Sequence, residues 1–234
     1  MEPAEWRELL ARGELEVLGR MPWSSNATFL VNVEAAGVET RGIYKPGRGE
    51  RPLWDFPEAI YRREVAAYEL AVALGLELVP ETIVRESAVY GEGSLQRYID
   101  ADFEEQYFTL LDDPANAETL RVIAAFDVVA NNADRKGGHL LKDGDGHIWG
   151  IDHGLCFHQE TKLRTVMWDF AAEPIPAVVT EWLGRLRKDR ARYLMGLIDA
   201  DEIDALLQRA ERLVGIGTFP APRNDHRAYP WPLV

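Results

Sequence analysis

Residues 131–141 read NNADRKGGHLL, and this polar stretch separates two apolar segments of the chain. LRVIAAFDVVA, residues 120–130, comes before it, and IWGIDHGLCF, residues 148–157, follows it. Both segments are apolar enough to be buried, so the charges of the loop between them lie against the core. Charges in such a place need a partner or a ligand. The stretch is therefore predicted to carry function.

The composition is that of a globular chain. Its 234 residues are 47% hydrophobic, which is enough to form a core in one domain of two lobes. The sequence has no uninterrupted run of about 18 apolar residues, so we expect no transmembrane helix. The acidic N-terminus does not resemble a signal peptide. The single cysteine, Cys156, fits a reducing compartment and is read as a buried small hydrophobe. We therefore expect a cytoplasmic protein.

The net charge restricts the partners of the chain. Its formal value is −13, and the lysines and arginines are scattered among acidic residues. Nucleic-acid binding needs a basic surface, so we expect no nucleic-acid partner. The same charge disfavours tight docking on an anionic membrane.

Hydrophobic periodicity and turn residues divide the chain into two regions. The first contains a helix ended by Gly13, five strands, and a helix over residues 57–74 that follows the third strand and stops at Gly75. The second is mostly helical, with predicted helices over 115–130, 177–198 and 200–215 and a hairpin over 139–152. We expect an α+β fold with a β-rich N-lobe, residues 1–99, a helical C-lobe, residues 100–234, and a cleft between them. Tyr229 and Trp231 of the proline-rich tail are expected to pack across the body.

The helix predicted over residues 57–74 carries one unusual acid. On a helical wheel Glu64 lies within the apolar arc that contains Ile60, Ala67 and Leu74. A carboxylate that faces the interior is costly unless a cation meets it. Lys45 is the candidate, because strand alternation turns its side chain inward. The alternative is that Glu64 lies at the margin of the helix and reaches solvent.

The loop between the first two strands, RMPWSSNATF, is rich in small hydroxyl and amide residues. Such a turn can present backbone N–H groups to an anion without a basic surface. An ordinary hairpin turn explains the same residues.

Two aspartates are predicted to meet at the cleft. Asp134 lies in the polar loop after a buried helix, and Asp152 lies at the end of the second hairpin strand. Two carboxylates placed in this way can hold Mg²⁺ and orient a hydroxyl group. Together with Lys45 and Glu64, they form a set of residues suited to phosphoryl transfer.

These motifs resemble those of the phosphatidylinositol 3-/4-kinase superfamily, especially its type II 4-kinase branch and small bacterial kinase-like proteins of that branch. The resemblance runs from Pro22 to Phe157. SSNATF is similar to the serine-rich phosphate loop of that family, IYKP to its lysine strand, and GSLQRYI to its hinge. DVVANNADRKGGH resembles the catalytic loop, and IDHGLCF the metal-binding segment. Several matches in order are more specific than any single one.

The resemblance implies a two-lobed protein-kinase-like fold, and an ATP- and Mg²⁺-dependent phosphotransferase that acts on a hydroxyl of a lipid, a small molecule or a protein. Its catalytic residues would be Asp134, Lys45 and Arg135. Its nucleotide-binding residues would be Ser24, Ser25, Asn26, Lys45, Glu64, Tyr98 and Ile99, and Asp152 would hold the metal.

One position departs from the pattern of the family. Five residues after the catalytic aspartate the family has a metal-binding asparagine, whereas this chain has His139. Imidazole is a poorer ligand for Mg²⁺ than an amide oxygen, which would favour Mn²⁺. Asn132 is a second candidate metal ligand in the same loop.

Two other classes of function remain open. His139 is compatible with a nucleotide-binding pseudokinase that has a regulatory role. A metal-dependent hydrolase could use a transition-metal site built from His139, Asp152, His153, Cys156 and His158, although no HExxH or CxxC spacing is present. The expected partners are ATP and a hydroxyl acceptor whose identity the sequence does not reveal.

Overall fold

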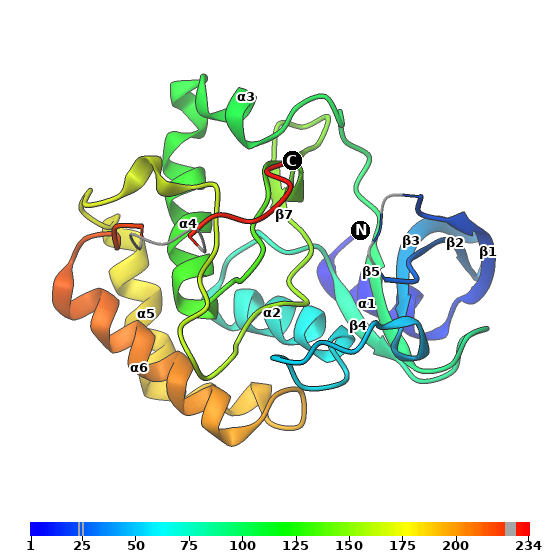
Figure 1. Cartoon of the computed structure of the whole chain (residues 1–234). Coiled ribbons are helices and arrows are strands. Elements are labelled where there is room, and N and C mark those ends of the chain that lie inside the picture. Colours follow the sequence, from blue (N-terminus) through cyan, green and yellow to red (C-terminus); the bar gives the residue numbers. More distant parts are fainter. Residues whose placement is uncertain (23, 25, 223–227) are drawn as a thin grey trace.

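The computed structural model describes residues 1–22, 24, 26–222 and 228–234, and it shows two lobes (Figure 1). The N-lobe is built on an antiparallel sheet in the order β1-β2-β3-β5-β4. Its strands are β1 (Glu14–Arg20), β2 (Phe29–Ala35), β3 (Val38–Pro46), β4 (Thr82–Arg85) and β5 (Gly93–Arg97). The predicted α+β fold with a β-rich N-lobe and a helical C-lobe is confirmed.

Helices form most of the C-lobe and border the sheet. They are α1 (Pro3–Arg12), α2 (Tyr61–Leu74), α3 (Tyr107–Leu111), α4 (Ala117–Ala130), α5 (Ala177–Asp189) and α6 (Ala200–Ile216). A small hairpin of β6 (Leu140–Lys142) and β7 (Ile148–Gly150) follows α4. The polar loop that begins at Asn131 therefore connects α4 to this hairpin.

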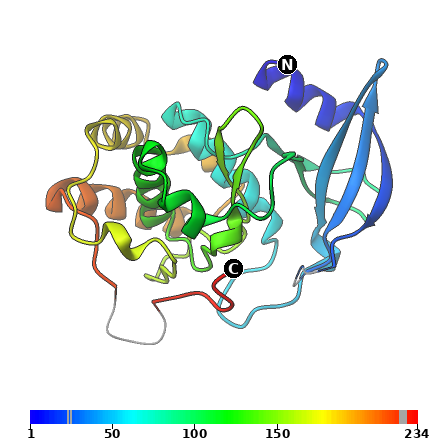
Figure 2. The ribbon, with the colours of Figure 1, turned by 90° about the horizontal axis from the view of Figure 1, so that it is seen from above.

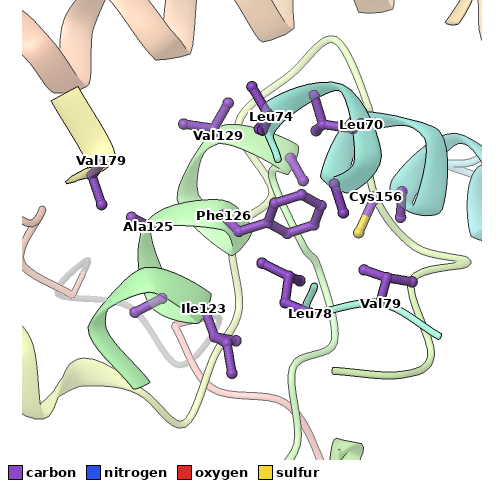
Figure 3. Close-up of a cluster of buried hydrophobic side chains, with 14 of the residues drawn as sticks. Leu70, Leu74, Leu78, Val79, Ile123, Ala125, Phe126, Val129, Cys156 and Val179 are labelled. Carbon is purple, nitrogen blue, oxygen red and sulfur yellow. The ribbon is translucent and has the colours of Figure 1, made fainter. Parts of the chain in front are cut away.

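Helix α2 lies between the sheet and the C-lobe helices in both views (Figures 1 and 2). It contacts β4 and β5, and its buried residues from Ala66 to Leu74 belong to the core cluster that also contains α4, α5 and α6. Figure 3 shows the Phe126 ring between α2 and α4, close to Leu78, Val79 and Cys156. Burial of such an aromatic side chain contributes about 1.5–3 kcal/mol. The core of the C-lobe therefore holds α2 in place under the sheet.

Two predicted helix boundaries were wrong. Helix α2 begins at Tyr61 instead of residue 57, because Ala59 has a positive φ of 62° and Glu50 accepts hydrogen bonds from the backbone N–H groups of Ile60 and Tyr61. Helix α5 ends at Asp189 instead of residue 198. Arg190 and Ala191 both have left-handed backbone angles, which stop the helix before a short 3₁₀ turn.

The predicted packing of the tail through Tyr229 and Trp231 was also wrong. Trp231 is 87% exposed and Tyr229 is 49% exposed. The tail is held by its backbone, because the carbonyl of Ala228 accepts from Trp168 Nε1 and the carbonyl of Leu233 accepts from the N–H of Gly137 at 2.7 Å. The C-terminus consequently lies beside the loop between α4 and β6.

Within the described ranges, no helix combines the length and the apolar character needed to cross a bilayer.

A buried ion pair joins α2 to α6. Arg63 donates to Glu202 at 2.5 Å and to the carbonyl of Cys156 at 2.6 Å, and both side chains of the pair are almost fully buried. The sequence analysis did not single out Arg63. The positive charge of Arg63 is compensated by the carboxylate of Glu202, which lies 139 positions further along the chain.

We predict that Glu202→Gln lowers the free energy of unfolding by about 3 kcal/mol, because it leaves the buried guanidinium of Arg63 without a counter-charge. Glu211→Gln on the same helix is the matched control. Glu211 lies 3.7 Å from Arg187, both side chains are more than half exposed, and the change should cost less than about 1 kcal/mol. Urea unfolding of both variants measures the difference. Equal costs would show that the buried pair contributes no more than a surface pair.

Candidate active site

Lys45 reaches the cleft from the end of β3. It pairs with Ser94 of β5 in the sheet, and a Cβ at Gly93 would lie 2.4 Å from the carbonyl oxygen of Lys45, so only glycine fits there. The Lys45 ammonium lies 2.5 Å from Glu64 Oε1, and the Glu64 side chain is 4% exposed. The predicted Lys45–Glu64 pair is confirmed, and the solvent-exposed alternative for Glu64 is wrong.

Glu64 also holds the segment that contains Asp152. Its second oxygen, Oε2, accepts from the backbone N–H of His153 at 2.9 Å. A Cβ at Gly154 would lie 2.7 Å from Ile60 Cγ2 and 3.2 Å from Glu64 Oε1. The glycine of the IDHG sequence therefore allows this segment to approach α2 closely.

Asp152 completes the charged cluster. Its φ of 61° is left-handed, which is unusual for a residue other than glycine and is common where a side chain is held for function. Its Oδ1 lies 2.9 Å from Lys45 Nζ, and its Oδ2 lies 3.2 Å from His139 Nε2. One carboxylate is thus in contact with side chains from two different parts of the chain.

The pKa values of these groups follow from burial and from their neighbours. The nearby Lys45 ammonium holds the pKa of Asp152 well below its usual range, against the effect of burial. Burial alone would lower the pKa of Lys45, but Asp152 and Glu64 outweigh it and raise that pKa. Burial raises the pKa of Glu64, with Lys45 opposing the shift. Lys45 therefore stays charged between two acids.

Asp134 lies on the C-lobe side of the same cleft. Its side chain is 28% exposed and its Oδ2 is 3.1 Å from Lys136 Nζ. Burial raises the pKa of Asp134, with Lys136 opposing it. The backbone N–H of Asp134 donates to Asn132 Oδ1 at 3.0 Å. This bond fixes the loop at the position of the aspartate.

A buried network holds the loop from below. Arg135 donates to both carboxylate oxygens of Asp127, at 2.7 and 3.0 Å, and its guanidinium also contacts the carbonyls of His139 and Ile151. The two-point geometry is one that arginine forms and lysine does not. Arg135 and Asn132 are both fully buried, and the structure does not bring either side chain to the cleft.

The cleft has a volume of about 370 Å³ and takes its lining from both lobes. Ser24 and Asn26 line it, as predicted for the phosphate loop, whereas Ser25 lies outside the described residues. Ser24 Oγ is 2.7 Å from Thr28 Oγ1, and Asn26 Oδ1 accepts from the N–H of Arg51. The remaining lining includes Lys45, Glu50, Glu64, Asp134, Lys136, His139, Asp152 and Gly154.

The predicted hinge residues lie where the chain leaves β5. Tyr98 donates its backbone N–H to the carbonyl of Arg41, and the guanidinium of Arg41 lies over the Tyr98 ring at 4.3 Å. Ile99 is buried. Neither residue lines the cleft described above, so the structure separates them from the charged cluster.

The oxygen donors suit a divalent cation that arrives with phosphate groups. Asp152 has an accessible carboxylate, and Asp134 is on the opposite wall of the cleft. Mg²⁺ is usually bound by one or two carboxylates together with substrate phosphates and water. Within the described residues no three His, Cys, Asp or Glu side chains are grouped to hold a metal by themselves. The residues present therefore fit a nucleotide-borne metal.

The residues of the alternative transition-metal site do not come together. His153 contacts Arg135 and the Phe126 ring, Cys156 is in the core, and His158 packs against Phe56. Only His139 and Asp152 are adjacent. These five residues therefore do not form the metal site that the hydrolase hypothesis requires.

Sequence analysis missed three residues that shape the site. Asp127 is the only acidic residue in the apolar segment 120–130. Such an isolated charge indicates that a buried cationic partner lies next to it. Glu50, which caps α2, and Lys136, which pairs with Asp134, had no comparable signal because their partners are set by the fold.

Solved kinases share this architecture. The chain superimposes on the Golgi casein kinase with a TM-score of 0.54 and 13% identity, over 94% of this chain and 79% of that one. A structure of that kinase with Mn/ADP bound gives the same TM-score over 92% and 75%. The Helicobacter pylori proinflammatory kinase CtkA matches with a TM-score of 0.50 and 11% identity, over 87% of this chain and 92% of that one. The fold is therefore kinase-like.

No family model matches the chain. A curated protein of Mycobacterium tuberculosis, Protein Rv2133c, is 39% identical to it over 262 residues, which cover 96% of this chain and 94% of that protein. Identity at this level over nearly the full length of both proteins places the chain in the same family as Protein Rv2133c.

Proposed function

We propose that the chain is an ATP-dependent phosphotransferase that uses Mg²⁺ or Mn²⁺. The observation that carries the proposal is the cluster of Lys45, Glu64 and Asp152 on one wall of a cleft, with Asp134 on the other. Kinase activity needs the lysine–glutamate pair and the metal-binding aspartate in place together. The Mn/ADP complex of the Golgi casein kinase supports the choice of ligands.

Each residue of the cluster has a separate task. Lys45 contacts the α- and β-phosphates, while Glu64 holds its ammonium toward the cleft. Ser24, together with Asn26, covers the phosphates. Asp152 is the ligand of the divalent cation, which when bound neutralises charge on the phosphate oxygens. Adenine is proposed to extend away from the charged cluster to the backbone near Tyr98 and Ile99, which lies outside the lining of the cleft.

Asp134 acts on the acceptor. Its carboxylate orients the acceptor hydroxyl and accepts its proton as the new bond to phosphorus forms. Lys136, 3.1 Å away, balances the negative charge of Asp134 beside the phosphates. Arg135 follows Asp134 as in the lipid kinases, and its burial makes it a positioning residue: it holds the loop through Asp127.

A place in the phosphatidylinositol 3-/4-kinase superfamily is part of the proposal and rests on the ordered motifs between Pro22 and Phe157. The fact that Lys45, Glu64, Asp134 and Asp152 line one cleft supports this part of the proposal. None of these contacts requires the acceptor to be a lipid.

Isothermal titration with ATP and each metal ion, followed by a measurement of ADP release, tests the proposal as a whole. Binding with turnover is expected for the kinase. Binding without turnover supports the pseudokinase alternative, for which His139 is the specific observation, since it stands where the family has asparagine. Absence of nucleotide binding with either metal ion would refute both.

We predict that Asp152→Asn and Asp134→Asn have different effects. Asp152 faces the metal and the phosphates, so its loss should weaken metal-dependent ATP binding by at least about tenfold. Asp134 acts in the transition state, so its replacement should lower kcat by roughly 10²–10⁴-fold and leave ATP affinity nearly unchanged. Titration calorimetry and ADP release measure the two quantities.

Asp145→Asn, in the exposed turn of the β6–β7 hairpin, is the control for removal of an aspartate. It should change neither quantity. Equal losses of ATP affinity in the Asp152 and Asp134 variants would mean that their roles are wrongly assigned.

His139 occupies the position proposed for a second metal ligand. Its Nε2 lies 3.2 Å from Asp152 Oδ2, close to the roughly 3 Å that separates adjacent donors around an octahedral cation with bonds of about 2.1 Å. Burial lowers the pKa of His139 to about 4, so the imidazole is neutral at pH 7, the form that can bind a metal. A nitrogen donor favours Mn²⁺ over Mg²⁺.

His139→Asn is therefore predicted to shift the metal preference of ATP binding and turnover from Mn²⁺ toward Mg²⁺, because it supplies an amide oxygen. His147→Asn, which changes a histidine outside the cleft, controls for general effects of the substitution. An unchanged Mn²⁺ to Mg²⁺ ratio in the His139 variant would contradict the metal role. His139 would then act as a hydrogen-bond donor that orients Asp152.

A further inference from the structure

A second and larger cavity opens on the other side of Asp134. Its volume is about 980 Å³, and it is formed by the segment before α2, the segment after Asp152 and the C-terminal tail. The described residues that line it are Trp54, Asp55, Phe56, Pro57, Asp134, His158, Gln159, Glu160, Thr161, Lys162, Leu163, Arg164, Tyr229, Pro230 and Trp231. Pockets of about 300–1,000 Å³ typically hold small molecules.

Asp134 is the one described residue that lines both this cavity and the cleft with Lys45 and Asp152. A group in the larger cavity would therefore meet a phosphoryl group from the cleft beside Asp134. This arrangement makes the cavity the place where an acceptor hydroxyl would lie.

Three of the residues that line the cavity are exposed aromatic side chains. Trp54 is 96% exposed and Trp231 is 87% exposed, with Tyr229 half exposed beside them. Exposed indole rings are costly in water, and flat aromatic faces bind rings and apolar surfaces of ligands. Their position around a polar cavity suits an acceptor that has a ring or an apolar face.

Among the described residues that line the cavity, Lys162 and Arg164 have basic side chains, and these two differ in their partners. Lys162 forms an ion pair with Asp55 at 2.9 Å and lies 5.9 Å from the centroid of the Trp54 ring. In the described part of the chain, the Arg164 side chain has no hydrogen bond or ion pair at contact distance, although it is near enough for its charge to favour the ionised forms of Asp134 and Asp55. Arg164 is therefore the basic group that a ligand can engage.

The backbone of Arg164 is held firmly next to the catalytic aspartate. Its N–H donates to the carbonyl of Asn132, and its carbonyl accepts from the N–H of Arg135, both at 3.0 Å. These two residues flank Asp134 on either side. Thr165 continues the contact through a parallel bridge with Arg135. The backbone position of Arg164, from which its side chain extends, is thus fixed by hydrogen bonds to the loop that carries Asp134.

We propose that this cavity is the acceptor site, and that Arg164 binds an anionic group on a metabolite-sized hydroxyl compound whose ring lies against Trp54 and Trp231. Sugar acids and sugar phosphates have this chemistry. The inference rests on the proposed phosphotransferase function and names its substrate class. A free small molecule is favoured over a protein, because the cavity accommodates a ligand of metabolite size.

The transfer step is balanced without a further reactant. The acceptor oxygen forms a bond to the γ-phosphorus of ATP, and the bond from that phosphorus to the bridging oxygen breaks. ADP leaves with the electron pair of the broken bond. The proton of the acceptor hydroxyl passes to Asp134 and then to solvent.

The test compares charged and uncharged acceptors in matched pairs. Glucose 6-phosphate and glucuronate are each compared with glucose, and glycerol 3-phosphate with glycerol, by ATP-dependent transfer of labelled phosphate and by ADP release. Dephosphorylated casein serves as the protein acceptor. In the unaltered chain at least one charged sugar derivative should be preferred over its uncharged partner.

Arg164→Gln should raise the acceptor KM for the charged compound by roughly 10- to 100-fold, the range expected for loss of one charge-assisted hydrogen bond, and leave KM for the uncharged partner unchanged. Arg164→Lys should keep part of the preference. Arg192→Gln, an exposed arginine that lines neither cavity, should keep all of it. Trp54→Ala should raise KM for the charged sugar derivative more than for glycerol 3-phosphate, which has no ring.

Three results would overturn the inference: no charged compound in the panel is preferred, casein alone is phosphorylated, or Arg164→Gln lowers kcat equally for charged and uncharged acceptors. The last result would place Arg164 on the transferred phosphoryl group. Calorimetry with ADP and Mn²⁺ is run on the same samples. A chain that binds the nucleotide and fails the acceptor test refutes only this inference, whereas a chain that does not bind it refutes the proposed function.

Discussion

The Glu64 carboxylate is the group on which the arrangement of the site depends. It lies on α2, whose buried residues from Ala66 to Leu74 belong to the core of the C-lobe. One oxygen accepts from Lys45 at the end of the sheet, and the other accepts from the N–H of His153, next to Asp152. A buried carboxylate is costly unless all its bonds are made. Three parts of the chain must therefore come together for any of them to be stable.

A second buried carboxylate has the same effect on the opposite wall. Asp127 accepts from both Arg135 and Asn132, and Asn132 in turn accepts from the N–H of Asp134. The loop that carries Asp134 is consequently fixed from inside the C-lobe. Glu64 on α2 and Asp127 on α4 therefore fix the two walls of the cleft relative to each other without a covalent link between them.

Much of the candidate site was predictable from local patterns. Strand alternation placed Lys45, and the helical wheel placed Glu64 on a buried face, because both periodicities are local properties of the backbone. The change of pattern around Asp134 and Asp152 marked the functional loops. The wheel was less informative elsewhere on α2: Val72 is exposed and Arg63 is buried, since this helix is covered on nearly all sides and its contacts are made with distant segments.

The sequence by itself determined the two-lobed fold, the succession of strands and helices along the chain and the identity of the charged residues at the cleft, because periodicity, turn residues and isolated buried charges act over a few positions. Only the tertiary structure decided that Arg135 and Asn132 are interior supports, that Trp231 stays exposed, and that Arg164 lies beside Asp134. Each of these outcomes depends on contacts between segments far apart along the chain. Their geometry is set by packing of the whole core and leaves no periodic trace in the sequence.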